Sequence, residues 1–115
     1  MIDYHKQLVS ALQSIGIGVH YELSLTADIK TPCISYQERN NADAETGDTL
    51  GYSRITYTIK VWGNDLAAIQ ENAQKIDRVL RPLGWKRTSS QELHDYQSTM
   101  IQKILTYECL AKEEY

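Results

Sequence analysis

The stretch Tyr52–Trp85, YSRITYTIKVWGNDLAAIQENAQKIDRVLRPLGW, joins a strand pattern directly to a helix pattern. In its first part, apolar and polar residues alternate, which is typical of a strand that buries one face and exposes the other. The apolar positions are Ile55, Tyr57, Ile59 and Val61, and the polar positions between and before them are Arg54, Thr56, Thr58 and Lys60. The alternation predicts a strand over Tyr52–Trp62.

The second part of this stretch predicts a helix over Asp65–Arg81, with Asn64 as its N-cap. Pro82 and Gly84 are expected to end it, because proline cannot continue the helical hydrogen bonding and glycine tolerates a left-handed turn. Apolar residues recur at spacings of three and four, at Leu66, Ile69, Ala73, Ile76, Leu80 and Leu83. We expect this stripe to pack on the sheet, with Leu66 as its first contact.

The region before Tyr52 predicts one helix and two strands. The helix is expected over Asp3–Ile15, with Asp3 as its N-cap, because Leu8, Leu12 and Ile15 fall on one helical face. A short strand, Val19–Leu23, and a strand over Cys33–Arg39 follow. The second of these and the Tyr52–Trp62 strand would form a long β-hairpin.

The connection between the hairpin strands, Asn40–Gly51, is polar and acidic. It contains Asp43, Glu45 and Asp48 and no lysine or arginine. These carboxylates lack the ligand spacing and the terminal glutamate of a calcium-binding loop. A solvated tip or a contact with another protein is the better interpretation.

Two further strands are expected after the second helix. Trp85–Leu93 is mostly polar and fits the edge of a sheet, and Ser98–Ala111 has an apolar face made by Ile101, Leu105, Tyr107 and Cys109. The predicted order is therefore α-β-β-β-α-β-β. This order indicates a single α+β domain over residues 1–115, with a mainly antiparallel sheet and two helices packed on one face.

Composition excludes several classes of protein. The chain has 115 residues, a formal net charge of −3 and dispersed basic residues, of which only Lys86 and Arg87 are adjacent, so specific binding to duplex DNA is disfavoured. No apolar run approaches the roughly 20 residues that cross a bilayer. Polar residues among the first ten positions also argue against a signal peptide.

No catalytic, cofactor or metal motif stands out. Glu92, His94 and Asp95 are close in sequence, but in a strand Asp95 would point away from the other two, and a solvated edge is the simpler interpretation. Cys33 and Cys109 have no metal-type spacing and are expected to be buried, reduced thiols. We therefore expect no enzymatic activity, no cofactor and no bound metal.

The aromatic residues are unusual, with eight tyrosines, two tryptophans and no phenylalanine. Rings with a polar group are enriched at protein interfaces. The alternative is that Tyr57 and Tyr107 belong to the core and that the other rings cover the edges of the sheet.

Several segments, in order, resemble the tail-terminator (tail-completion) proteins of long-tailed, siphovirus-type bacteriophages and prophages. They are an N-terminal helix, the strand TPCISYQERN, the strand YSRITYTIKVWGND, the helix LAAIQENAQKIDRVLRPLGW and the strand STMIQKILTYECLA. The resemblance covers essentially the whole chain and is one of pattern and order. Its most characteristic part is Ile59–Trp62, followed directly by a helix N-cap.

The resemblance implies a structural virion protein that forms a ring, typically of six subunits. Such a ring caps the tail tube, ends its elongation and presents a joining surface to the head connector or neck protein. The implied partners are other copies of the chain, the tail-tube protein and the neck protein, with no membrane and no specific nucleic-acid binding, although DNA passes through the ring. The implied location is the host cytoplasm during assembly and then the virion.

In that interpretation the hairpin tip and its base are the expected contact region, comprising Arg39, Asp43, Glu45, Asp48, Tyr52 and Arg54. Two other classes of function remain open. One is a small-molecule-binding or regulatory α+β domain, since a fold alone does not determine function. The other is an enzyme whose site is assembled from neighbouring subunits.

Overall fold

The computed structural model describes residues 4–22, 30–43, 52–95, 97 and 99–112. In chain order the elements are α1 (His5–Gln13), β1 (Gly18–Tyr21), β2 (Cys33–Asp43), β3 (Tyr52–Gly63), α2 (Leu66–Leu80), the 3-10 turn η3 (Arg81–Leu83), β4 (Lys86–His94) and β5 (Ile101–Lys112). The α+β class and the order α-β-β-β-α-β-β are confirmed.

The five strands form one sheet in the order β1-β2-β3-β5-β4. The pairs β2–β3, β3–β5 and β5–β4 are antiparallel, and β1 pairs with β2 in parallel. Strand β3 is central and is paired along its length on both sides. The polar strand β4 lies at one edge of the sheet, as its composition predicts.

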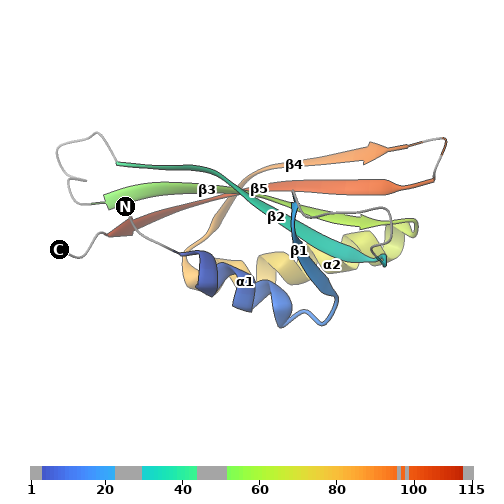
Figure 1. Ribbon diagram of the computed structural model, residues 1–115, viewed down its shortest axis with the longest axis horizontal. Helices are drawn as coiled ribbons and strands as arrows, with labels where there is room; N and C mark the ends of the chain where they lie inside the picture. Colours follow the sequence, from blue (N-terminus) through green and yellow to red (C-terminus); the bar gives the residue numbers. More distant parts are fainter. Residues whose placement is uncertain (1–3, 23–29, 44–51, 96, 98, 113–115) are drawn as a thin grey trace.

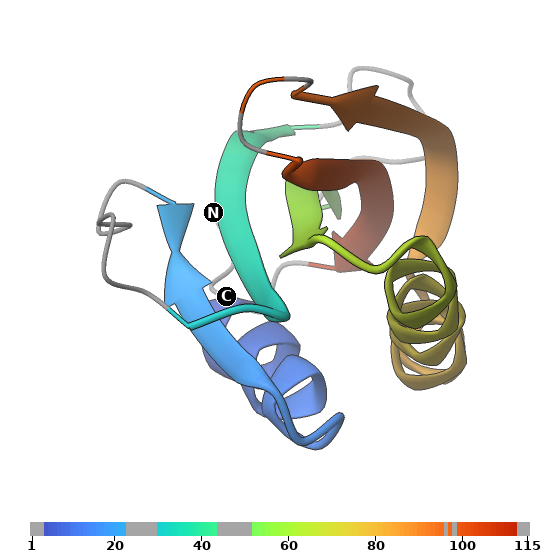
Figure 2. The same cartoon turned by 90° about the vertical axis from the view of Figure 1, so that its right-hand side faces the viewer.

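Both helices lie on the same side of the sheet (Figure 1), α1 near β1 and α2 near β4 (Figure 2). The fully buried aliphatic side chains come from both helices and from the sheet face that they cover: Leu8, Leu12, Ile34, Ile55, Ile59, Val61, Ile69, Ile76, Leu80 and Leu105. Burial of each large aliphatic side chain contributes about 1.5–3 kcal/mol, so this layer holds the helices on the sheet.

One residue of the predicted α2 stripe does not pack. Leu66 is 43% exposed, whereas Ile69, Ile76 and Leu80 are fully buried. The reason is that the helix first reaches the sheet at Ile69. The Ile69 side chain packs closely on Gly63, the last residue of β3, where an added Cβ atom would lie 3.5 Å from it. Leu66 is one turn nearer the start of the helix and therefore lies beyond the end of that strand.

The N-cap of α2 is Asp65, so the prediction of Asn64 is wrong by one residue. The Asp65 carboxylate accepts a hydrogen bond from the backbone N–H of Ala67 at 3.1 Å. At the other end, Gly84 adopts the left-handed conformation with φ +95°, and the backbone N–H of Trp85 donates to the carbonyl of Leu80. The predicted stop is confirmed.

The first helix is shorter than predicted. Helix α1 starts at His5, and its N-cap, Tyr4, makes no side-chain capping bond. The predicted cap, Asp3, lies outside the described residues. Leu8 and Leu12 are buried, but Ile15 follows the end of the helix and is only half-buried.

The β2–β3 hairpin is longer than predicted, because β2 continues to Asp43 instead of stopping at Arg39. A β-bulge interrupts the register here: Glu38 is opposite Tyr57 and Asn40 is opposite Thr56, which leaves Arg39 as the extra residue. The molecule measures 49 × 24 × 22 Å. At the end where β2 stops and β3 starts, the strands extend beyond both helices (Figure 1).

Candidate interaction surfaces

The two predicted contact residues whose side chains the structure describes are both exposed arginines. Arg39, the extra residue of the bulge, donates a hydrogen bond to the side chain of Gln37 at 3.4 Å. Arg54, on β3, has a 56% exposed side chain and forms an ion pair with Glu108 of β5 at 3.3 Å. An exposed pair of this kind adds little stability, so both guanidinium groups remain available to a partner.

The other four predicted contact residues are Asp43, Glu45 and Asp48 of the tip and Tyr52 at its base. Asp43 ends β2 and Tyr52 starts β3, so their backbones lie at the protruding end of the hairpin. Glu45 and Asp48 lie outside the described residues. The contact role of all six residues stays a prediction.

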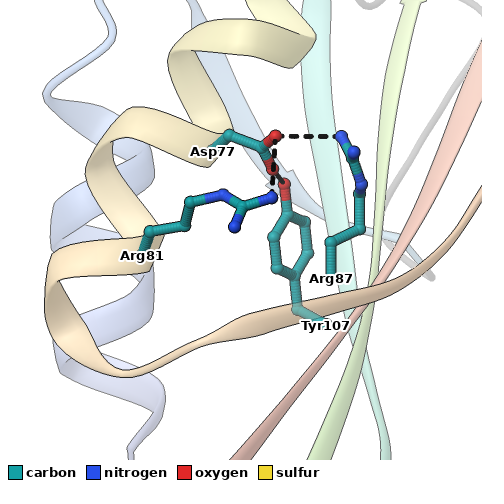
Figure 3. A network of polar contacts seen from close by, with 4 residues as sticks. All are labelled: Asp77, Arg81, Arg87 and Tyr107. Carbon is teal, nitrogen blue, oxygen red and sulfur yellow. Dashed lines mark hydrogen bonds and ion pairs between the residues drawn. The ribbon is translucent and has the colours of Figure 1, made fainter.

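A second polar cluster, which the sequence did not indicate, lies where α2 meets β4 and β5 (Figure 3). The carboxylate of Asp77, on α2, accepts a hydrogen bond from the buried hydroxyl of Tyr107. The same carboxylate pairs with Arg87 of β4 at 2.9 Å and with Arg81 at 3.7 Å. Burial, and then the hydrogen bond to Asp77, raises the pKa of the Tyr107 phenol well above its usual range.

The sequence indicated no such contact because its members are up to 30 residues apart. An aspartate directly after an apolar stripe position and a tyrosine on the buried face of a strand were the available signals. Pairing the two required the tertiary structure.

The sheet face away from the helices carries another polar arrangement. Lys60 forms an ion pair with Glu22, and its ammonium group lies 5.6 Å from the centre of the Trp62 ring. The indole N–H of Trp62 donates to the hydroxyl of Ser35 at 2.8 Å. The side chains of Lys60, Trp62 and Glu22 are only partly buried, so this face offers an aromatic ring and a cation to solvent.

Glu92 and His94, which are close in sequence on β4, contact each other and side chains of neighbouring elements. His94 lies 2.9 Å from the carboxylate of Glu92, whose other oxygen is near Lys103 and Gln70. The hydrogen bond with His94 lowers the pKa of the Glu92 carboxyl, and the charge of Lys103 lowers it further. Asp95 instead accepts a hydrogen bond from the backbone N–H of Gln97 in the turn after β4. Among the described residues, no three histidine, cysteine or acidic side chains are placed to hold a metal ion.

The cysteines are buried thiols, and two of the tyrosines are core residues. Cys33 and Cys109 are free and buried, and burial raises the pKa of both thiols. Tyr57 and Tyr107 are core residues, and the Tyr57 ring packs edge-on against Trp85. Tyr21, in contrast, is 41% exposed. The aromatic residues are therefore divided between core and surface.

Two depressions in the described surface are shallow and open. One lies between the helices and is lined by Gln7, Ser10, Ala11, Ser14, Val79 and Leu83. Another lies along the last turns of α2 and is lined by Gln74, Asp77, Arg78, Arg81 and Pro82. No helix in the described part of the chain has the length and apolar character needed to cross a membrane.

Comparison with known proteins gives a likeness of fold. No family model and no curated protein matches the sequence. Among solved structures, a chain in the virion of a native gene transfer agent particle superposes with a TM-score of 0.68 at 14% sequence identity. The superposition covers 93% of this chain and 90% of that one. The two chains therefore share a fold along nearly their whole lengths.

Proposed function

We propose that the chain is a structural protein of a phage-type virion and that it acts as a tail terminator. In this proposal, six copies form a ring that caps the tail tube, stops its elongation and provides the surface to which the head connector or neck protein joins. The observation that most supports the proposal is the shared fold with a chain of a virion particle, over 93% and 90% of the two chains.

The shape of the subunit suits a ring. A closed ring of identical subunits needs two different surfaces on each copy that are complementary to one another. In this proposal the protruding end of the β2–β3 hairpin would be one such surface, and the helix-covered side would offer another (Figure 1). The edge strand β4, paired on one side by β5, provides a third exposed element.

The charge of the chain suits a ring through which DNA passes. A net charge of −3 gives little general attraction for phosphates, so DNA would not be held in the channel. The partners in this proposal are other copies of the chain, the tail-tube protein and the neck protein. The protein would assemble in the host cytoplasm and remain at the head–tail junction.

The role is structural and not enzymatic in this proposal. Two polar clusters of the described residues connect elements of the fold, since Asp77 joins α2 to β4 and β5, and Glu92 joins β4 to β5 and α2. These structural contacts account for the groups that could otherwise be assigned to acid–base chemistry.

The proposal is tested by combining the purified protein with polymerised tail tubes. We expect rings in electron micrographs of the protein alone at high concentration or at the ends of the tubes, and tubes that stop growing once capped. A protein that stays monomeric under both conditions, and tails of normal length that join heads in its absence, would exclude this function. Stabilisation of the monomer by a metabolite would instead support a regulatory domain.

A further inference from the structure

Two arginines are exposed at the C-terminal end of α2. The side chain of Arg81 is 58% exposed and lies 3.7 Å from the carboxylate of Asp77, which also pairs with Arg87 of β4 (Figure 3). Arg78 is exposed, lines the same shallow depression as Arg81, and forms no ion pair within the described residues. We call Arg78 and Arg81 the arginine pair.

The arginine pair has unused binding capacity. The Asp77 carboxylate lies closer to Arg87, at 2.9 Å, than to Arg81. A guanidinium group carries five N–H donors, and its flat face stacks on aromatic rings. The surface that suits the arginine pair best therefore combines aromatic rings with a carboxylate.

Such a surface lies at the other edge of the sheet. The rings of Tyr21 on β1 and Tyr36 on β2 have centres 5.8 Å apart, and the His5 ring of α1 contacts the Tyr36 ring at 5.3 Å. Tyr21 is 41% exposed and Tyr36 is half-buried. Glu38 is exposed and follows Tyr36 by two residues, so it lies on the same face of β2. We call Tyr21, Tyr36 and Glu38 the tyrosine patch.

The arginine pair and the tyrosine patch lie on opposite sides of the subunit. Strands β1 and β4 are the two edges of the sheet, with α1 near β1 and α2 near β4 (Figure 2). Val79 and Leu83 line the depression between the helices, whereas Asp77 and Arg81 meet on the side of α2 nearer β4. Gln7, near the start of α1, lines the same depression as Leu83, so the start of α1 and the end of α2 lie at the same level along the molecule (Figure 1).

We propose that the arginine pair of one subunit contacts the tyrosine patch of the next copy in the ring. This inference rests on the ring of the proposed function and deepens it, because it assigns both sides of a contact between subunits. A head-to-tail ring requires two different surfaces on each copy that are complementary to one another. Guanidinium groups stack on tyrosine rings, and a carboxylate beside the rings accepts their hydrogen bonds and fixes their orientation. Tyrosine and arginine are also the residues most enriched at protein interfaces.

Duplex DNA is a less suitable ligand for the arginine pair. Proteins that bind duplex DNA through its backbone contact several phosphates, about 6–10 in strongly salt-dependent cases. Two arginines beside the Asp77 carboxylate, on a chain with a net charge of −3, offer fewer contacts and a repulsive background.

The test is a double-mutant cycle across the contact between subunits. Arg78→Ala with Arg81→Ala removes both guanidinium groups, and Tyr21→Leu removes the more exposed ring but keeps an apolar side chain. Each variant should raise the concentration for half-assembly of the ring about fivefold to tenfold. The variant that combines all three substitutions should assemble no worse than the more affected of the two, because every contact has already lost one partner. Sedimentation velocity across a concentration series measures all of them.

Each arm of the cycle has a matched control. Tyr21→Phe keeps the ring, so its rings of subunits should form as in the unmodified protein. Lys30→Ala with Lys86→Ala removes two positive charges from other exposed positions and should also leave assembly unchanged. Melting curves show whether each variant is folded. If loss of Arg81 unfolds the chain, Arg78→Ala alone serves, because Arg78 has no ion pair to lose within the described residues.

The outcomes separate this inference from the proposed function. If the unmodified protein forms no ring, the proposed function fails, and the inference fails with it. If it forms rings and the folded arginine variant does so equally well, only the inference is overturned. Additive effects in the combined variant would also overturn it, and so would equal losses for Tyr21→Phe and Tyr21→Leu. Duplex DNA binding that the arginine variant loses, with ring formation unchanged, would assign the arginine pair to DNA instead.

Discussion

The hydroxyl of Tyr107, on the buried face of β5, donates a hydrogen bond to the carboxylate of Asp77 on α2. Through Arg87 the same carboxylate also reaches β4. One acidic side chain therefore connects a helix and two strands, at the boundary between the core and the surface that carries Arg81 and Arg87. A buried phenol without an acceptor would be costly, so this contact satisfies a core group as well as joining elements.

Removal of Asp77 should destabilise the fold. Asp77→Ala leaves the Tyr107 hydroxyl without its acceptor and Arg87 without its partner, and we expect a loss of about 2–3 kcal/mol in the free energy of unfolding. The control is Glu71→Ala, on the same helix, whose exposed ion pair with Lys75 should contribute under about 0.5 kcal/mol. Urea unfolding measures both. Equal losses would show that the Asp77 contacts add nothing.

The raised pKa of Tyr107 makes a prediction about alkaline pH. A phenol whose pKa is higher in the folded than in the unfolded chain binds its proton more tightly in the folded state. Its contribution to stability is complete below the unfolded value of about 10 and declines as the pH rises above it. The difference in unfolding free energy between the unmodified protein and Tyr107→Phe should therefore shrink as the pH rises above about 10. A constant difference would contradict this.

The packing of α2 predicts unequal effects of one substitution at two positions of the stripe. Ile76→Asp places a charge without a partner in the core and should cost several kcal/mol, a large part of a typical stability of about 5–15 kcal/mol. Leu66→Asp, at an exposed position, should change stability by under about 1 kcal/mol. Melting curves of the two variants test this. An Ile76→Asp variant that melts like the unmodified protein would overturn the placement of the helix.

The periodicity of apolar residues in the sequence predicts most of the helices and strands, and there is a physical reason for this. The alternation at Ile55, Tyr57 and Ile59, and the helical spacing of Ile69, Ile76 and Leu80, record which face of each element is buried. Because buried positions must be apolar and recur with the period of the element, the spacing predicts both β3 and α2 to within a residue or two. The inward face of β5, from Ile101 to Cys109, was found in the same way.

The features that sequence did not predict depend on backbone pairing and distant contacts. Residues 40–43 pair with β3 through backbone hydrogen bonds, which polar side chains do not reveal, so β2 was expected to end at Arg39. The parallel pairing of β1 with β2 is likewise invisible in the pattern. Asn64 and Asp65 are both good caps, and only the geometry selects Asp65. Arg81 and Arg87 are close in sequence, but only the tertiary structure places both around the carboxylate of Asp77.

The cysteines are predicted to be passive. Cys33 and Cys109 are 2% and 6% exposed, and burial raises the pKa of both thiols, which reduces the reactive thiolate. We expect thiol reagents to label the native protein slowly and the unfolded protein at once. A folded variant with Cys33→Ser and Cys109→Ser should still assemble. A Cys33–Cys109 bond found by mass spectrometry of protein from cells would contradict this interpretation.

The last prediction separates two roles for Arg54, at the base of the hairpin. Its ion pair with Glu108 is exposed on both sides, so Arg54→Ala and Glu108→Ala should each lower the unfolding free energy by under about 1 kcal/mol. Their effects on assembly should differ in the proposed ring. Arg54→Ala removes a side chain that we expect to contact the neighbouring subunit, whereas Glu108→Ala breaks the same ion pair and leaves the arginine free. Sedimentation velocity across a concentration series should show weaker ring formation for Arg54→Ala only. If both variants weaken the ring equally, the ion pair itself is what matters, and Arg54 serves to hold β3 against β5. If neither does, Arg54 is not part of the subunit interface.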